Sequence, residues 1–134
     1  MAGVRRAKLS SHMGGGHSVL VVDDEPSIRL LCKVNLELEG YHVLEADTLA
    51  EARRHLRESD VDAVLLDVHV GAEDGRALVQ EIRAGRPSAG IALFSGSSEV
   101  GAAATAGADA VIPKPFVLDH LIRTVGQLVH SARV

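Results

Sequence analysis

Residues 19–26 read Val-Leu-Val-Val-Asp-Asp-Glu-Pro, and this stretch decides the fold. The apolar run Val19–Val22 predicts a strand that is buried on both faces, as in a parallel sheet covered by helices. Pro26 suits the first turn of a helix, where the missing N–H group of proline would have no partner in any case. Asp23 and Asp24 therefore follow a buried strand, at the edge where parallel α/β sheets bind ligands.

Two other short stretches place charged groups in the same way. Asp67 follows the apolar run Ala63–Leu66, and Lys114 lies between two prolines after the run Ala110–Ile112. We expect these side chains to meet Asp23 and Asp24 at one edge of the sheet. Carboxylates in such a cluster repel one another unless a cation lies among them, and Mg²⁺ is the natural hard dication for oxygen ligands.

The rest of the chain alternates between strand and helix signals. The predicted strands cover residues 19–22, 41–45, 63–66, 91–94 and 110–112. The predicted helices run from 26 to about 39, 48 to about 57, 75 to about 84, 99 to 106, and 117 to about 131. Thr48 is the expected cap of the second helix, and Gly40 and Gly85 are expected helix ends. This pattern predicts an α/β fold with a doubly wound five-stranded parallel sheet and helices on both faces.

Composition narrows the class of protein. The 134 residues suffice for one domain, and 46% of them are hydrophobic while only 2% are aromatic, which predicts an aliphatic core. The net charge of -4 gives no basic footprint for nucleic acid, and no apolar run is long enough to span a membrane. A single cysteine, Cys32, rules out an internal disulfide and fits the cytoplasm. Residues 1–17, rich in glycine near their end, read as a flexible leader or a tag.

Each motif also has a simpler structural interpretation. Acidic residues before Pro26 favour the helix dipole, a lone Asp67 is a common loop residue, and Ser95 with Gly96 is a common turn. The dipole explains one carboxylate better than two adjacent ones, and the combination of Asp23, Asp24 and Asp67 favours a functional pocket. None of the seven histidines has zinc-ligand spacing, but His69 lies two residues after Asp67.

At this point the chain resembles the receiver domain of two-component response regulators. The resemblance covers about residues 18–131, and we assign residues 18–134 to this domain. It rests on five stretches taken in order, each weak alone. They are the 19–26 stretch, Gly-Tyr-His-Val-Leu-Glu-Ala (40–46), Asp-Val-His-Val-Gly-Ala-Glu-Asp-Gly (67–75), Phe-Ser-Gly (94–96) and Gly-Ala-Asp-Ala-Val-Ile-Pro-Lys-Pro-Phe (107–116).

The resemblance implies a fold and a set of roles. The fold would be flavodoxin-like with strand order 2-1-3-4-5. Asp67 would be the phospho-acceptor, taking a phosphoryl group from the phosphohistidine of a sensor histidine kinase or a histidine phosphotransfer protein. Asp24, Asp67 and the backbone carbonyl of His69 would bind Mg²⁺ directly, and Asp23 would hold a metal-bound water.

Two further residues complete the implied site. Ser95 would hydrogen-bond the phosphoryl oxygen, and Lys114 would pair with it; the Lys114–Pro115 bond would be cis. The domain would not be an enzyme, since it would catalyse only its own phosphorylation and dephosphorylation. It would act on an unidentified output domain or effector, with no nucleic acid or membrane bound by the domain itself.

The chain departs from the family pattern in three places. Gly71 replaces a common proline, which predicts a looser loop after Asp67. Val111 replaces a common aromatic switch residue, and the interval from Ser95 to Lys114 is about three residues shorter than usual. The last two departures predict switching through the order of residues 96–107 rather than through an aromatic rotamer, and a monomer with or without phosphate.

Three other classes remain as alternatives. An Mg²⁺-dependent aspartyl-nucleophile phosphatase usually carries a second aspartate two residues after the nucleophile, where this chain has His69. A flavin-binding electron carrier would need a phosphate-binding loop of serine, threonine and glycine after the first strand. Asp23 and Asp24 stand there instead and would repel the phosphate. A pseudo-receiver that serves only as a scaffold would not need the complete set of Asp24, Asp67, Ser95 and Lys114.

Overall fold

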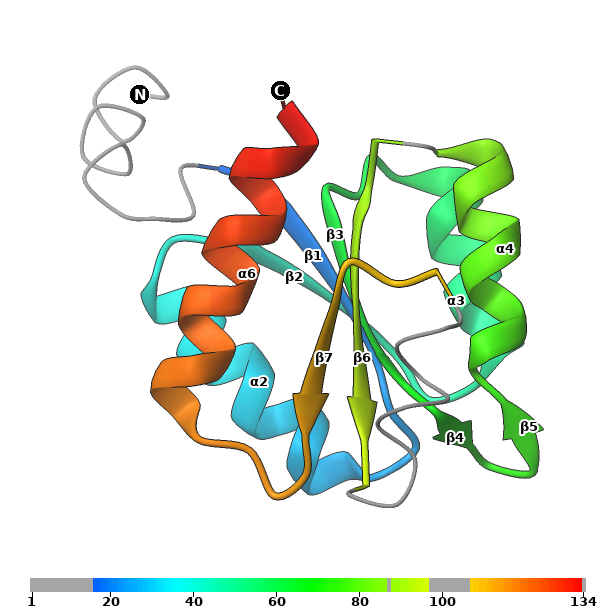
Figure 1. The fold of residues 1–134 in the computed structure, drawn as a ribbon, viewed down its shortest axis with the longest axis horizontal. Helices are drawn as coiled ribbons and strands as arrows, with labels where there is room; N and C mark the ends of the chain where they lie inside the picture. The colour runs from blue at the N-terminus through cyan, green and yellow to red at the C-terminus, as the bar shows by residue number, and fades with distance from the viewer. Residues whose placement is uncertain (1–15, 87, 97–106, 134) are drawn as a thin grey trace.

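The computed structural model describes residues 16–86, 88–96 and 107–133, which form one α/β domain (Figure 1). A five-stranded sheet lies at its centre, in the order β2-β1-β3-β6-β7 with every neighbouring pair parallel. The predicted order 2-1-3-4-5 is therefore confirmed. The strands are β1 (Ser18–Val22), β2 (His42–Ala46), β3 (Ala63–Asp67), β6 (Gly90–Ser95) and β7 (Ala110–Pro113).

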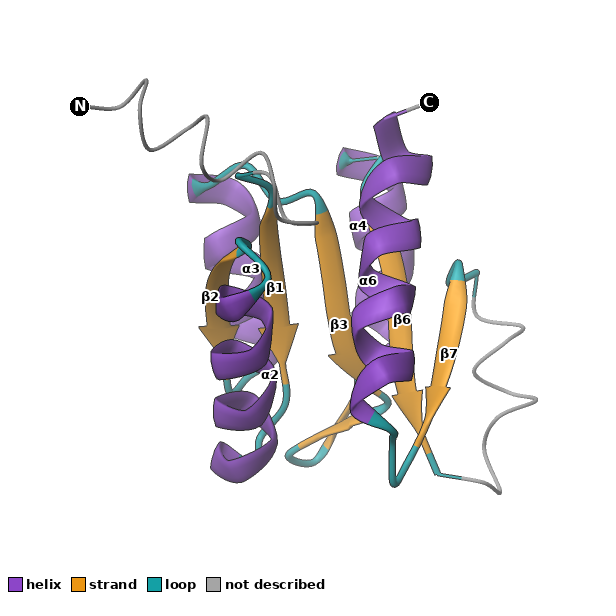
Figure 2. Cartoon of the chain, turned by 90° about the vertical axis from the view of Figure 1, so that its left-hand side faces the viewer, coloured by secondary structure: helices purple, strands orange, loops and turns teal. Residues whose placement is uncertain are grey.

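Helices cover both faces of this sheet, as the sequence predicted. In Figure 2, α2 (Pro26–Leu38) and α6 (Leu118–Arg133) lie in front of the strands, and α3 (Leu49–Glu58) and α4 (Arg76–Gly85) lie behind them. Side chains alternate along each strand, so the sheet contributes to two separate cores. Leu20 and Leu66 pack with α3 and α4, whereas Val21 and Leu65 pack with α2 and α6.

Local sequence signals explain where the helices begin and end. The Thr48 hydroxyl accepts a hydrogen bond from the Glu51 amide, and the Glu51 carboxylate accepts one from the Asp47 amide, so two hydrogen bonds cap the N-terminus of α3. Gly40 ends α2 with a φ of 93°, a conformation that glycine adopts without strain. Gly85 is the last residue of α4 rather than the residue after it, which shifts the predicted end by one position.

The structure adds a hairpin that the sequence analysis did not contain. Strands β4 (His69–Val70) and β5 (Glu73–Asp74) pair in antiparallel fashion directly after β3. Gly71 lies in the turn between them with a φ of 62°. Strands this short carry too little periodicity to be read from sequence. Gly71 therefore occupies a hairpin turn in the structure, and the predicted looseness of the loop after Asp67 remains untested.

Several predictions lie outside the described residues. The helix predicted over residues 99–106 is among them, so the predicted change of order in 96–107 and the predicted monomer remain predictions. Residues 1–15 of the expected leader also lie outside. Val111 is described: it is half-buried and packs against the core beneath α3 and α4. Among the described residues, no helix is long and apolar enough to cross a membrane.

Candidate functional site

The strand ends bring the predicted acidic residues together. Asp23 follows β1, and Asp67 is the last residue of β3, the strand that pairs with β1. Asp23, Asp24 and Asp67 each offer a carboxylate oxygen within 4.8 Å of the others. Asp23 is fully buried and Asp67 is 9% exposed, whereas Asp24 is exposed. The cluster is therefore open to solvent at Asp24.

Lys114 is the cation of this cluster. Its backbone amide donates to the Ser95 carbonyl, which extends the β6–β7 ladder and fixes where the side chain begins. Its ammonium group donates to a carboxylate oxygen of Asp67 at 3.1 Å and of Asp23 at 3.2 Å. The same group lies 5.6 Å from the centre of the Phe94 ring. One lysine is thus shared between two buried carboxylates. The Lys114–Pro115 bond is cis, as the resemblance implied.

Burial and charge shift the pKa values of this cluster. Burial raises the pKa of the Asp23 carboxyl above its usual value, and the Asp67 carboxylate raises it further, although a hydrogen bond from the Glu25 amide and the charge of Lys114 oppose the shift. Burial by itself lowers the pKa of Lys114, but the two carboxylates outweigh it and the net pKa lies above the usual value. Lys114 is therefore held as a cation at neutral pH.

The hairpin and the start of α4 fix the chain around Asp67. The Gly71 amide donates to the Asp24 carboxylate at 3.1 Å, and the Gly75 amide donates to the Val68 carbonyl at 2.6 Å. A Cβ atom at Gly75 would overlap the backbone carbonyl oxygen of Asp67. A glycine at this position therefore lets α4 begin directly against the acidic residue. Gly75 stands in the 67–75 motif, but this role does not follow from the sequence, because the contact joins Gly75 to a carbonyl that only the fold brings close.

The remaining predicted residues lie at the same edge but are oriented differently. Ser95 ends β6 and is 1% exposed, and its hydroxyl donates to the neighbouring Gly96 carbonyl at 3.0 Å. His69 begins β4 with an exposed side chain, and its amide lies 3.4 Å from the Asp67 carboxylate. The structure thus brings together Asp23, Asp24, Asp67 and Lys114, with the backbone of His69 beside them. The Ser95 hydroxyl instead bonds to the carbonyl of the next residue, Gly96.

The donor set at this edge suits a hard dication. Three carboxylates and one ammonium carry a formal charge of -2 when all are ionised (three negative charges and one positive). Oxygen ligands that include a solvent-exposed carboxylate are the usual environment of Mg²⁺, which keeps several of its waters. The acidic cluster is therefore compatible with a bound dication.

Comparison with protein families agrees with this geometry. The model of the response regulator receiver domain matches residues 19–126. The transcriptional regulatory protein PrrA of Mycobacterium leprae is 36% identical over 114 residues, which cover 83% of this chain and 49% of PrrA. The sensor kinase CckA of Brucella abortus is 32% identical over 132 residues, which cover 95% of this chain and 14% of CckA. The chain thus spans about half or less of the length of these relatives.

Solved structures give the same result. The receiver domain of NtrX from Brucella abortus superimposes with a TM-score of 0.78 and 31% identity, and the match covers 84% of this chain and 98% of that domain. The family match over residues 19–126 includes Asp23, Asp67 and Lys114. From sequence, geometry and these relatives together, the chain belongs to the response regulator receiver domain family of two-component systems.

Proposed function

We propose that this receiver domain accepts a phosphoryl group on Asp67 from a phosphohistidine of a sensor histidine kinase or a histidine phosphotransfer protein. The observation that carries the proposal is the position of Asp67. It ends the central strand β3, it lies in the three-carboxylate cluster, and one of its oxygens is 3.1 Å from the Lys114 ammonium group. No other described carboxylate combines these features.

The chemistry of the transfer fits the groups at this edge. A carboxylate oxygen of Asp67 attacks phosphorus, the N–P bond breaks, and the electron pair leaves with the imidazole of the donor. Such a transfer depends on positioning and charge neutralisation more than on covalent chemistry from the protein. Lys114 offers a fixed positive charge, and the Ser95 hydroxyl needs only a rotation about its side-chain bond to leave the Gly96 carbonyl for a phosphoryl oxygen.

The acidic cluster would hold Mg²⁺ through Asp24, Asp67 and the carbonyl of His69, with Asp23 bonded to a metal-bound water. The bound ion would supply positive charge against the transferring phosphoryl oxygens. The Gly71 amide, bonded to the Asp24 carboxylate, would orient that ligand. On this proposal the domain is not an enzyme that acts on other substrates, because it catalyses only its own phosphorylation and the hydrolysis of its own acyl phosphate.

Intact mass spectrometry tests the acceptor. With acetyl phosphate and Mg²⁺, the wild-type chain should gain one phosphate, and Asp67→Asn should gain none. Asp109→Asn, at the opposite edge of the sheet, is the matched control and should be phosphorylated like the wild type. An undiminished adduct in Asp67→Asn would show that another residue is the acceptor.

Thermal melting tests the metal site without phosphorylation. A ligand that binds only the folded state raises the melting temperature by mass action. Mg²⁺ should therefore raise the melting temperature of the wild type and raise that of Asp24→Ala less. Asp74→Ala, which removes an exposed carboxylate of the hairpin outside the cluster, should respond like the wild type. The absence of any shift with either Mg²⁺ or Mn²⁺ would refute the site.

The phosphoryl donor needs a docking surface that borders this edge, and α2 offers one. This helix begins three positions after Asp23 and carries a stripe of apolar side chains that are 43–67% exposed. A cavity of about 390 Å³ continues the stripe between α2 and α6. The exposed apolar residues of this surface, which we call the α2 stripe, are Leu30, Leu31, Val34 and Leu38. We propose that an apolar helical face of the phosphodonor protein docks there.

Two phosphodonors separate docking from chemistry. Replacing Leu38, the most exposed residue of the stripe, by serine should slow transfer from a phosphorylated histidine kinase by about tenfold, as loss of an interface anchor does. Phosphorylation by acetyl phosphate should be unchanged, because that donor needs no docking surface. Arg54→Ser, at an exposed position of α3 on the opposite face, is the control and should leave both rates unchanged. Equal slowing with both donors would place Leu38 in structural support of the site instead.

A further inference from the structure

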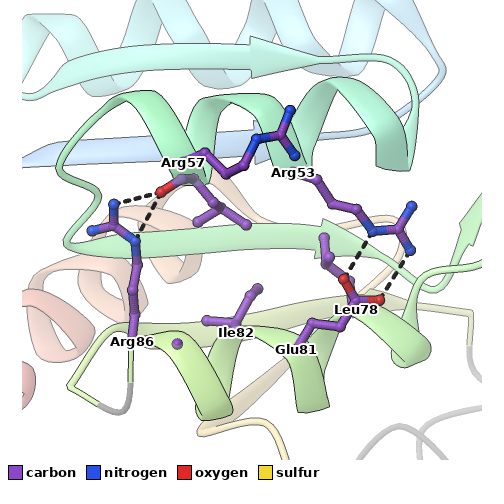
Figure 3. A pocket seen from close by; sticks show the side chains of 8 residues that line it. Arg53, Arg57, Leu78, Glu81, Ile82 and Arg86 are labelled. Carbon is purple, nitrogen blue, oxygen red and sulfur yellow. Dashed lines mark hydrogen bonds and ion pairs between the residues drawn. The ribbon is translucent and has the colours of Figure 1, made fainter.

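The opposite face of the domain contains a hollow that the proposed function does not use. It lies between α3 and α4, has a volume of about 460 Å³, and is shown in Figure 3. This volume falls within the range of small-molecule sites, about 300–1,000 Å³. We call it the α3–α4 hollow. Its lining consists of Arg53, Leu56, Arg57, Leu78, Glu81, Ile82, Gly85 and Arg86.

Hydrogen bonds between the two helical segments close the hollow at both ends. At one end the Arg53 guanidinium donates two hydrogen bonds to the Glu81 carboxylate, at 2.8 and 3.0 Å. At the other end the Arg86 guanidinium donates to the backbone carbonyl of Leu56 (Figure 3) and also to that of Ser59. Along the chain of α3, Arg53 lies three positions before Leu56 and six before Ser59, which corresponds to about 5–9 Å of helical rise.

This length decides the kind of occupant. A helix with its side chains is about 10–12 Å in diameter, which is more than the spacing between the two closed ends. A helix of a partner protein therefore does not fit between them. A compact organic group does fit. The hollow is therefore shaped for a small molecule and not for a helix of a partner protein.

The interior of the hollow is apolar, and its rim is basic. Leu78 is fully buried, Ile82 is 3% exposed, and Leu56 is half-buried. A Cβ atom built on Gly85 would meet nothing within 4 Å, so the hollow stays open beside this glycine. Leu56 and the open side of Gly85 are therefore the apolar surface that a ligand reaches, above the buried Leu78 and Ile82.

The charge of the rim favours an anion. Three arginines and one glutamate give a formal charge of +2 (three positive charges and one negative). Glu81 already neutralises Arg53, whereas Arg57 is exposed and no hydrogen bond or ion pair joins it to any described residue. A guanidinium group offers a planar pair of donors that matches a carboxylate, phosphate or sulfonate. Arg57 is thus the arginine of the rim that is available to a ligand.

We propose that the α3–α4 hollow binds a small organic anion, with a compact apolar body against Leu56 and the open side of Gly85 and its acidic group on Arg57. Arg53 and Arg86 keep their present partners and form the two ends of the site. The proposal is independent of phosphorylation at Asp67, because no residue of the hollow belongs to the acidic cluster.

A fluorescent naphthalene sulfonate, 8-anilino-1-naphthalenesulfonate, is a suitable probe because it joins an aromatic body to one anionic group. Titration into ¹⁵N-labelled protein should shift the backbone amides of Arg57, Gly85 and Arg86 in a saturable way. Inorganic sulfate, which lacks the apolar body, should cause no saturable shift at the same concentrations. The uncharged analogue N-phenyl-1-naphthylamine should bind more weakly than the sulfonate. Shifts confined to the α2 stripe, or equal affinity for the charged and uncharged probes, would overturn the proposal.

Three variants sharpen the test. Arg57→Gln should weaken binding of the sulfonate by about twofold to fivefold, as expected for the loss of one exposed ion pair. Gly85→Leu should abolish binding by filling the hollow, and it should not unfold the protein, because the position is helical and the space is open. Arg54→Gln removes an exposed arginine of the same helix that pairs with Glu58 outside the hollow, and it should bind like the wild type. Unchanged affinity in Arg57→Gln or in Gly85→Leu would overturn the proposal.

Discussion

The carboxylates at the two edges of the sheet have different hydrogen-bond partners. The parallel strands begin at one edge, the amino edge, and end at the other, the carboxyl edge. At the amino edge, Asp62 accepts a hydrogen bond from the Ser18 amide at 2.8 Å, and Asp109 accepts one from the Ile91 amide at 2.8 Å. Asp109 also has its own cation, Arg83, at 2.7 Å. At the carboxyl edge, Asp23 and Asp67 share one lysine. Carboxylates thus support the strands at one edge and crowd together at the other.

This difference separates structural from functional charge. An acidic group with its own hydrogen-bond donor stabilises the fold, because the donor favours the ionised carboxylate and offsets the cost of removing it from water. Acidic groups that share a donor are in electrostatic conflict, which a bound cation or a transferred group is able to relieve. Perturbed groups of this kind concentrate at functional sites. Mutations made in pairs, one at each edge, measure how far the contrast extends.

The largest effect is expected at the glycines where chain segments approach closely. At the carboxyl edge, Gly75→Ala forces a Cβ atom against the backbone carbonyl of Asp67, which cannot move without shifting β3. At the amino edge, Gly90→Ala places a Cβ atom 2.8 Å from the Cβ atom of Leu128 on α6. We expect losses of ~3 kcal/mol for Gly75→Ala and ~1 kcal/mol for Gly90→Ala in urea unfolding.

Equal losses for these two glycine variants would mean that α4 and α6 adjust equally well. In that case the close approach of α4 to Asp67 would not be a special constraint of the carboxyl edge.

The second effect concerns the cations. Lys114→Met leaves the buried Asp23 carboxylate and Asp67 without their shared partner, so we expect a loss of ~2 kcal/mol near neutral pH without metal. Arg83→Met leaves Asp109 with its backbone donor, so we expect a loss of ~1 kcal/mol or less. Mg²⁺ should restore part of the stability of Lys114→Met and none of that of Arg83→Met. Urea unfolding with and without Mg²⁺ measures both, and a larger loss for Arg83→Met would contradict the contrast.

The smallest effect concerns the carboxylates themselves. In the metal-free protein, Asp23→Asn removes a charge in conflict and should raise stability by ~0.5–1 kcal/mol near neutral pH. Asp109→Asn weakens two charge-assisted hydrogen bonds and should lower stability by ~1 kcal/mol. A loss of stability in metal-free Asp23→Asn would show that Lys114 satisfies Asp23 completely.

The pH dependence of Asp23→Asn has a definite sign. The pKa of Asp23 is raised in the folded protein, so the folded state binds this proton more tightly than the unfolded state. The resulting stabilisation is fully present below the usual value of 3.8 and is lost as the pH rises through the raised folded pKa. The gain from Asp23→Asn should therefore grow as the pH rises through this window. Urea unfolding at a series of pH values in a chelating buffer measures it, and a gain that shrinks with rising pH would contradict the assignment.

The sequence by itself determined the order of the five strands of the sheet and of the four described helices, and the convergence of the charged residues. Continuous aliphatic runs such as Val19–Val22 and Ala63–Leu66 are local signals of buried parallel strands, and Gly40 and Thr48 are local signals of helix ends. Once the strands are parallel and adjacent, Asp23, Asp67 and Lys114 must meet at one edge. The family resemblance followed from the same residues.

Only the tertiary structure decided which of these groups bond to one another and which of them are buried. Spacing along the chain does not show that Lys114 bridges Asp23 and Asp67, that Asp23 is buried while Asp24 is exposed, or that the Ser95 hydroxyl points to its own turn. The β4–β5 hairpin and the α3–α4 hollow are likewise products of packing. The physical reason is that hydrogen bonds, burial and pKa shifts depend on distances of a few ångströms between residues far apart in sequence, whereas periodicity and caps act within one helical turn or one strand.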